Sequence, residues 1–165
     1  MRKTVWVVKE WYVWPIAWLL AGRNYVAGVD AFIERVLAPA ARSGRTIGRL
    51  HVLSHGNVRR DPASGVPFDR FIDMGSGDRL SLGHFDTDGT PVAGLPTARF
   101  LAALGPVMRS GGRLIFSACH QGEGPLLRTM SRALGNDVKV SGYRKIGHPF
   151  GRGDVAFRNG LETKP

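Results

Sequence analysis

Apolar runs and amphipathic stretches alternate along the chain. Four runs of β-branched and aromatic residues predict strands, at 4–8, 48–54, 113–117 and 137–141. Apolar residues also recur at helical spacing after Asp30, Pro96 and Pro125, which predicts three helices. Strands that alternate with helices are typical of an α/β protein with a largely parallel sheet.

Capping residues and glycines mark the ends of the predicted helices. We expect Asp30 to cap the first helix and Pro39 to kink or end it. The glycines at 111–112 stop the second helix. Pro125 stands where a first helical residue would be, and Gly135 ends this third helix.

The stretch between Ser54 and Pro96 is rich in Gly, Pro and Asp and reads as largely irregular. Within it, residues 71–74 and 79–82 predict a hairpin around the turn at 75–78. Long loops beside strand ends tend to carry function, so we expect this stretch to border a site.

Length and composition indicate one globular domain over residues 1–165. The mass is 18.0 kDa and 43% of the residues are hydrophobic, which is enough for a single core. Cys119 is the only cysteine, so no disulfide forms within the chain. The apolar run at 11–22 is shorter than the roughly 20 residues of a membrane span. Lys9 and Glu10 interrupt a signal-peptide pattern, so we expect a cytoplasmic protein, with secretion as an effector as the alternative.

The chain is strongly basic. Its formal net charge is +10, from 23 Lys and Arg against 13 Asp and Glu, and the excess is spread along the chain instead of forming a tail. A basic nucleic-acid-binding domain is therefore one of the functions that stay open.

Two of the predicted strands lead to reactive side chains, His55 and Cys119. Neighbouring parallel strands end at one edge of a sheet, so we expect these side chains to lie close together. A thiol with a base nearby is a good nucleophile, and a histidine can protonate the leaving group, so the pair can run acyl transfer. The amides of Gly56 and Cys119 can form an oxyanion hole. This chemistry requires no cofactor and no metal.

The motifs Ser54-His55-Gly56 and Ser117-Ala118-Cys119 resemble those of the caspase-like clan of cysteine peptidases. In that clan one hydrophobic strand ends in His-Gly and a later one in Ala-Cys, and the stretch 117–124 looks most like bacterial CHAT-type domains. The resemblance covers roughly residues 49–143. It implies a caspase-like three-layer sandwich with a mostly parallel central sheet, and an endopeptidase with His55 as acid/base and Cys119 as nucleophile.

The same resemblance suggests where specificity resides. In caspase-like enzymes the pocket for the residue before the scissile bond is partly built after the strand that follows the nucleophile's helix, where this chain has Arg144 and Lys145. These cations favour an acidic substrate side chain. Asp86, or Asp69 or Asp73, entering from the long loop would instead favour Arg or Lys. The expected partner is a protein or peptide substrate.

A non-catalytic caspase-like interaction module is the alternative to an enzyme. A cysteine at the end of an apolar strand is, taken alone, usually a small buried hydrophobe. His51 and His55 would suit metal ligation on a helix, but on a strand they lie about 13 Å apart, so we expect no metal site.

Four tryptophans gather near the N-terminus, at Trp6, Trp11, Trp14 and Trp18. The last three have helical spacing. Either this segment packs on the sheet, or it forms a patch that docks a regulatory protein partner or a membrane interface.

Overall fold

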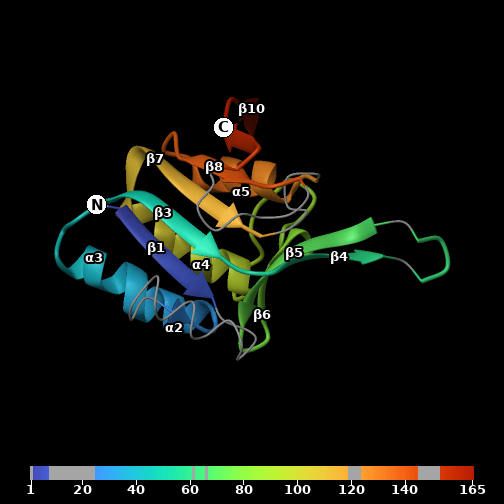
Figure 1. The fold of residues 1–165 in the computed structure, drawn as a ribbon, viewed down its shortest axis with the longest axis horizontal. Coiled ribbons are helices and arrows are strands. Elements are labelled where there is room, and N and C mark those ends of the chain that lie inside the picture. The colour runs from blue at the N-terminus through green and yellow to red at the C-terminus, as the bar shows by residue number, and fades with distance from the viewer. Residues whose placement is uncertain (1, 8–24, 61, 66, 119–123, 145–152) are drawn as a thin grey trace.

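The computed structural model describes residues 2–7, 25–60, 62–65, 67–118, 124–144 and 153–165. Ten strands lie in these residues: β1 Arg2–Val7, β2 Tyr25–Val26, β3 Ile47–Leu53, β4 Gly56–Arg60, β5 Pro67–Gly75, β6 Asp78–Ser81, β7 Met108–Ser117, β8 Lys139–Gly142, β9 Val155–Arg158 and β10 Leu161–Thr163. Seven of them form one sheet in the order β10-β9-β8-β7-β3-β1-β2, and β4, β5 and β6 form a second, smaller sheet (Figure 1).

The large sheet is mostly parallel. All neighbouring pairs from β2 to β8 are parallel, whereas β9 and β10 join antiparallel at one edge. This confirms the predicted α/β class with a mostly parallel sheet. The two strands that precede the sequence motifs, β3 and β7, were expected to be parallel and either adjacent or next-but-one; they are parallel and adjacent.

The helices pack on one face of the large sheet. Their bounds are α2 Val29–Phe32, the π-helix η2 Ile33–Leu37, α3 Ala38–Arg42, the 3-10 turns η3 Leu82–His84 and η4 Gly105–Val107, α4 Pro96–Leu104 and α5 Leu126–Leu134. Phe32 and Phe100 from the helices and Phe116 from β7 are fully buried in one core, with ring centroids 5.2 and 6.3 Å apart along the series. Burial of such rings supplies much of the driving force for this layer.

Residues on the opposite face of the large sheet are also buried, but they lie outside the helix-side core. Side chains alternate along a strand, so Ile115 and Ala156 point away from the helices. Both are buried, at 1% and 0% exposure, yet neither belongs to the helix-side core. Among the residues that the structure describes, helices cover only one face (Figure 1), so the second helical layer of the predicted three-layer sandwich does not lie among them.

The prediction that Asp30 caps the first helix is wrong, and Pro39, expected to kink or end the helix, does not end it. Asp30 does not cap it: Gly28, with φ 96°, is the N-cap residue, and the Val29 amide donates to the Asp78 carboxylate at 2.7 Å. Pro39 does not end it either, because η2 precedes α3 and the helical segment continues to Arg42. Pro39 lies in the first turn of α3, where its missing amide proton costs little.

Other boundaries also differ from the sequence pattern. Helix α4 ends at Leu104, and β7 already begins at Met108, so the glycines at 111–112 lie inside a strand instead of stopping a helix. The stretch expected to be irregular contains β4, which pairs with β5. The hairpin made by β5 and β6 is confirmed.

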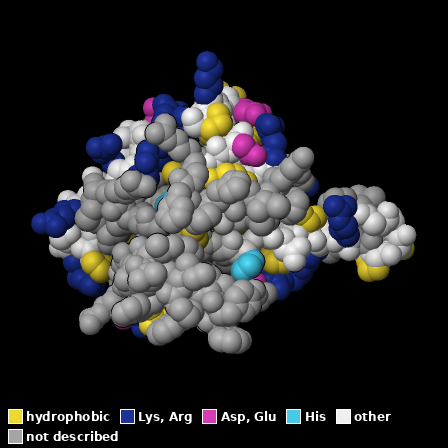
Figure 2. All heavy atoms as spheres, in the orientation of Figure 1, with side chains coloured by type: hydrophobic (Ala, Val, Ile, Leu, Met, Phe, Trp, Pro, Cys, Tyr) yellow, Lys and Arg dark blue, Asp and Glu magenta, His cyan; other side chains and the backbone are white. Residues whose placement is uncertain are grey.

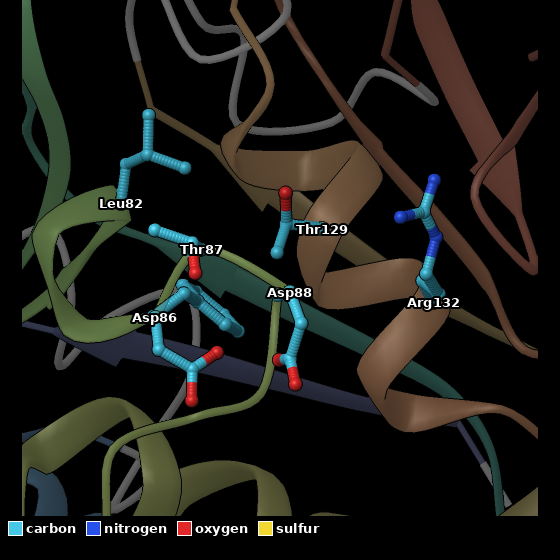
Figure 3. Close-up of a pocket in the computed structure, with 8 residues that line it drawn as sticks. Leu82, Asp86, Thr87, Asp88, Thr129 and Arg132 are labelled. Carbon is cyan, nitrogen blue, oxygen red and sulfur yellow. The ribbon is translucent and has the colours of Figure 1, made fainter.

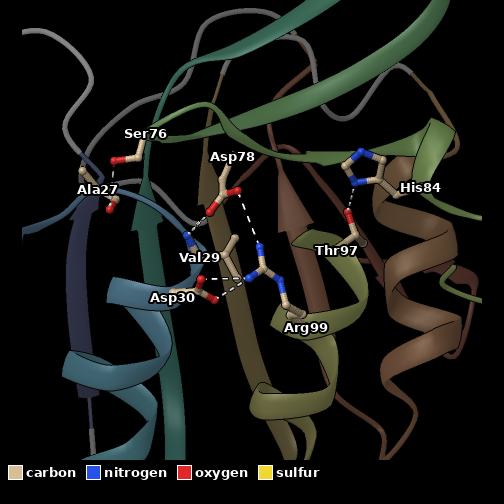
Figure 4. A network of polar contacts seen from close by, with 8 residues as sticks. All are labelled: Ala27, Val29, Asp30, Ser76, Asp78, His84, Thr97 and Arg99. Atoms are coloured by element: carbon tan, nitrogen blue, oxygen red, sulfur yellow. Dashed lines mark hydrogen bonds and ion pairs between the residues drawn. The ribbon is translucent and has the colours of Figure 1, made fainter. Parts of the chain in front are cut away.

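A polar network fixes the small sheet against the helices (Figure 4). Asp78, at the start of β6, accepts the Val29 amide and lies 3.6 Å from the Arg99 guanidinium, which also binds Asp30 at 2.8 Å. Farther along, His84 Nδ1 lies 2.9 Å from the Thr97 hydroxyl. The network thus joins the start of β6 to α2 and α4, and it joins the turn after β6 to α4.

Candidate functional site

The two motif strands end side by side at one edge of the large sheet. Leu53 of β3 is the register partner of Ser117 of β7, and the Ser54 amide donates to the Ser117 carbonyl at 3.4 Å. Carboxyl ends of parallel strands are where α/β folds bind ligands. The chain continues from this edge into His55 on one side and Ala118 on the other, so we take the edge as the candidate active site.

His55 has an exposed side chain on a fixed backbone. Its carbonyl accepts the Asp73 amide at 2.8 Å, and the Ser54 hydroxyl donates to the Asp73 carbonyl. These bonds join the segment after β3 to β5 and fix the backbone that carries the exposed imidazole. An imidazole presented in this way can act as a general acid or base.

Gly56 presents its amide away from the small sheet. In an antiparallel pair, residues alternate between hydrogen-bonded and non-hydrogen-bonded positions. Because the Asp73 amide donates to the His55 carbonyl, the next pair, Gly56 with Ile72, is the non-hydrogen-bonded kind. The Gly56 N–H therefore points away from β5, as an oxyanion-hole donor must.

A buried histidine–serine pair lies directly beneath this edge. The His51 Nε2 atom and the Ser117 hydroxyl are 2.6 Å apart, and the two residues are only 4% and 8% exposed. They come from adjacent strands on the face turned away from the helices. The sequence does not predict this pair, because no local pattern reveals which side chain of the next strand lies within reach of His51. The sequence suggested only metal ligation for His51.

Several residues that the sequence singled out lie outside the described part of the chain. Cys119 and Lys145 are among them, as are the tryptophans at 11, 14 and 18, and of Trp6 only the backbone is described. Ala118, the residue before Cys119, is fully buried.

Arg144 lines a pocket beside the start of α5. The pocket has a volume of about 240 Å³, and its walls are Gly124, Pro125, Arg128, Arg144, Val155, Phe157 and Glu162. Arg144 binds Glu162 at 3.0 Å, and its amide donates to the Asp154 carboxylate at 2.8 Å. Arg128 stacks over the Phe157 ring at 5.3 Å. Two cations against one carboxylate leave this pocket with a net positive charge.

Arg70 brings a further cation to the same place. Its side chain lies directly against the backbone of Gly124, so closely that a Cβ atom at that position would collide with it. Arg70 comes from β5, in the small sheet. Residues of the small sheet and of the C-terminal strands therefore both lie close to Gly124, just before α5.

Asp86 lies in a different pocket, of about 520 Å³, between the turn after η3 and helix α5 (Figure 3). Its carboxylate accepts the Thr90 amide at 2.8 Å. Hydrogen bonds from the Thr90 side chain and with Asp86 lower the pKa of Asp88 in the same turn. Thr129 and Arg132 of α5 form the other wall. The structure thus does not bring Asp86 together with Arg144, because the two line separate pockets.

Comparison with known proteins adds no assignment. No protein-family model matches the chain. No curated protein matches its sequence either. Among the described residues, no three His, Cys, Asp or Glu side chains gather as a metal site. No helix in the described ranges is both long and apolar enough to cross a membrane.

Proposed function

We propose that this protein is a caspase-like cysteine endopeptidase. The observation that supports it best is the register of the two motif strands: Leu53 and Ser117 are partners, and they stand two residues before His55 and Cys119 in the chain. The exposed imidazole of His55 and the outward amide of Gly56 are the further groups that such chemistry needs.

The reaction follows from these groups. His55 takes the proton of the Cys119 thiol, and the thiolate attacks the peptide carbonyl while the Gly56 amide stabilises the oxyanion. His55 then gives its proton to the leaving amine as the C–N bond breaks, which leaves a thioester on Cys119. Water, deprotonated by His55, hydrolyses the thioester, and the proton returns to the sulfur.

The pocket beside α5 supports an acidic preference for the substrate residue before the scissile bond. Arg128 and Arg144 outnumber Glu162 there, and Arg70 lies against Gly124 at its border. The acidic residues considered for a basic preference are engaged elsewhere: Asp69 accepts the Ser81 hydroxyl at 2.7 Å, and Asp73 accepts the Gly75 amide at 2.9 Å. Charge complementarity therefore favours Asp or Glu in the pocket.

Thiol alkylation tests the proposed nucleophile. Because Cys119 is the only cysteine, iodoacetamide can report on no other thiol. An unperturbed thiol has a pKa near 8.5, so fast labelling of the native protein at about pH 7 indicates an activated thiolate. We expect His55→Ala to slow labelling and abolish peptide cleavage, and His84→Ala, in the network behind the small sheet, to change neither.

A cysteine that reacts only after unfolding would overturn this proposal. Caspase-like enzymes are often latent, so labelling is measured on the full chain with and without candidate activators. Resistance to labelling in all of these conditions would place the protein with the non-catalytic interaction modules.

Cleavage of a peptide library tests the acidic preference. We expect Arg144→Gln to reduce cleavage after Asp and Glu relative to other residues, because the pocket loses one of its two cations. Arg132→Gln removes the same charge from the pocket that contains Asp86 and is the matched control. A strict preference for Lys or Arg in the unmodified protein would contradict the assignment of this pocket.

A further inference from the structure

Strand β4 is paired along one edge only. β5 pairs with its inner edge, and the order β4-β5-β6 leaves no described strand beyond β4. Because Gly56 and Ile72 form a non-hydrogen-bonded pair, the backbone groups of Gly56 and Val58 point outward, whereas those of Asn57 and Arg59 face β5. We call the outward N–H and C=O groups of Gly56 and Val58 the β4 edge.

Within the described ranges, one side chain occupies part of the β4 edge. The Val58 N–H donates to Asn57 Oδ1 at 2.7 Å, and the Asn57 side chain is exposed. Such local bonds from an asparagine to the backbone compete with strand pairing, so an incoming carbonyl oxygen can take the place of the amide oxygen. No described residue forms a hydrogen bond with the outward groups of Gly56. The β4 edge can therefore receive a further strand when the Asn57 side chain turns away.

The β4 edge begins at the candidate active site. Gly56 directly follows His55, and its outward N–H is the oxyanion donor of the proposed reaction. The hairpin of β4 and β5 projects from the body of the molecule (Figure 1), and Figure 2 shows Lys or Arg side chains on this projecting part. A peptide whose carbonyl oxygen is held at Gly56 therefore meets further outward backbone groups along the same strand.

We propose that the part of the substrate that follows the scissile bond binds the β4 edge as an added parallel strand. This inference rests on the proposed peptidase activity. Extended peptides commonly bind to sheet edges in this way, through main-chain hydrogen bonds. With the Gly56 N–H on the carbonyl oxygen of the residue before the scissile bond, parallel pairing fixes the next bonds. The second residue after the scissile bond donates its N–H to the Gly56 carbonyl, and its own carbonyl accepts the Val58 N–H.

The strand order of the large sheet sets the direction of the substrate. The pocket assigned to the residue before the scissile bond contains Arg144, Val155 and Phe157, which follow β8 or lie in β9. β8 lies on one side of β7, and β3, which leads to β4, lies on the other. The chain before the scissile bond is thus held on the β8 side, and the chain after it continues on the β4 side. Because β4 also runs away from the active site, the two strands are parallel.

Other occupants fit the β4 edge less well. An antiparallel substrate would carry the residues before the scissile bond along β4 instead of toward the β8 side, where their pocket lies. A second copy of this chain would bring the exposed side chains of Arg59 and Arg60 from two β4 strands together. Like charges on neighbouring strands destabilise a sheet. The substrate is the occupant whose position the Gly56 amide already defines.

N-methylated peptides test the pairing. The parent is an internally quenched peptide with Asp, or the residue that the peptide library favours, before the scissile bond and a run of alanines after it. Methylation at the second residue after the scissile bond removes the donor to the Gly56 carbonyl, so we expect kcat/KM to fall about tenfold. Methylation at the third residue is the matched control. The N–H of that residue points away from β4, so kcat/KM should change by less than about twofold.

Variants of β4 test the same bonds from the side of the protein. The readout is the ratio of kcat/KM for the parent peptide to that for a peptidyl coumarin amide, which has no residue after the scissile bond. Val58→Pro removes the outward N–H, and proline is tolerated at such positions of edge strands, so the ratio should fall about tenfold. Val58→Ala keeps this N–H and should keep the ratio. Asn57→Ala removes the competing acceptor and should raise it. Thermal unfolding checks that the variants fold, and the peptide series decides alone if Val58→Pro does not.

Three results would overturn this proposal and leave the peptidase activity standing. The first is an equal effect of methylation at the second and third residues after the scissile bond. The second is sensitivity to methylation only at the third residue before the bond, which would indicate antiparallel pairing. The third is equal kcat/KM for the coumarin amide and the longer peptide. If no peptide is cleaved and Cys119 reacts only after unfolding, the peptidase proposal itself fails, so the two failures are distinguishable.

Discussion

Replacing Ser117 by Ala should destabilise the protein far more than the loss of one hydroxyl at the surface would. The Ser117 hydroxyl lies 2.6 Å from His51 Nε2, and both residues are buried. The substitution removes one partner of a buried hydrogen bond and leaves the imidazole behind, which costs about 1–3 kcal/mol in the free energy of unfolding. In a domain of this size a loss of about 2 kcal/mol lowers Tm by roughly 4–8 °C.

Chemical and thermal unfolding of four proteins measure this effect: the unmodified chain, Ser117→Ala, His51→Leu and the double variant. A direct interaction predicts a coupling free energy of roughly 0.5–3 kcal/mol in this cycle. Ser43→Ala is the matched control, because the Ser43 hydroxyl also donates a hydrogen bond, at 2.8 Å to the Pro39 carbonyl, but is exposed. The control should cost less than about 0.5 kcal/mol. Equal losses in Ser117→Ala and Ser43→Ala, or purely additive effects in the cycle, would refute the reasoning.

Two further predictions concern pH and backbone conformation. Burial lowers the pKa of His84 below 6.5 against the opposing charges of Asp69 and Asp78, so the unfolded chain binds more protons in the window just below pH 6.5. The free energy of unfolding should therefore fall as pH drops through that window, and His84→Gln should flatten the fall; equal slopes would contradict this. Gly153→Ala should lower the free energy of unfolding, measured with urea, more than Gly94→Ala does. Both glycines have positive φ, but only at Gly153 would a Cβ lie 2.7 Å from a carbonyl oxygen, that of Gly142. Equal losses in the two variants would contradict the argument that close approach matters.

Local patterns in the sequence predict those elements whose stability depends mainly on their own residues. β3, β7, α4 and α5 all follow apolar runs or stripes. Helix α5 ends before Gly135 as expected, and it begins at Leu126, with Pro125 as the N-cap residue instead of the first helical residue. The parallel orientation of β3 and β7, in adjacent or next-but-one positions, could also be predicted, because near-continuous apolar strands are typical of parallel sheets.

Local rules fail where a distant segment supplies the missing partner. Asp30 has the side chain of an N-cap residue, but the carboxylate of Asp78, from the hairpin, binds the first amide of α2 instead. Pro39 is expected to kink or end a helix, yet the helical segment continues past it, with the π-helix η2 directly before α3. At Asp30 a tertiary contact thus outweighs the intrinsic preference.

Strand register is the property that the sequence conceals most completely. The charge of +10 appears evenly spread along the chain, because Arg49, Arg113, Lys139 and Arg158 are far apart in sequence. Only the pairing of β3, β7, β8 and β9 brings them into line. The same holds for His51 and Ser117, whose contact depends on which residues of adjacent strands lie opposite each other.

The buried pair and the candidate active site lie at neighbouring levels of the same two parallel strands. Leu53 and Ser117 are register partners at the strand ends, and His51 lies two residues before Leu53 on the same face of β3. The contact between His51 and Ser117 therefore joins β3 to β7 directly beneath the edge that leads to His55. A substitution in this pair loosens the two strands that carry the candidate active site.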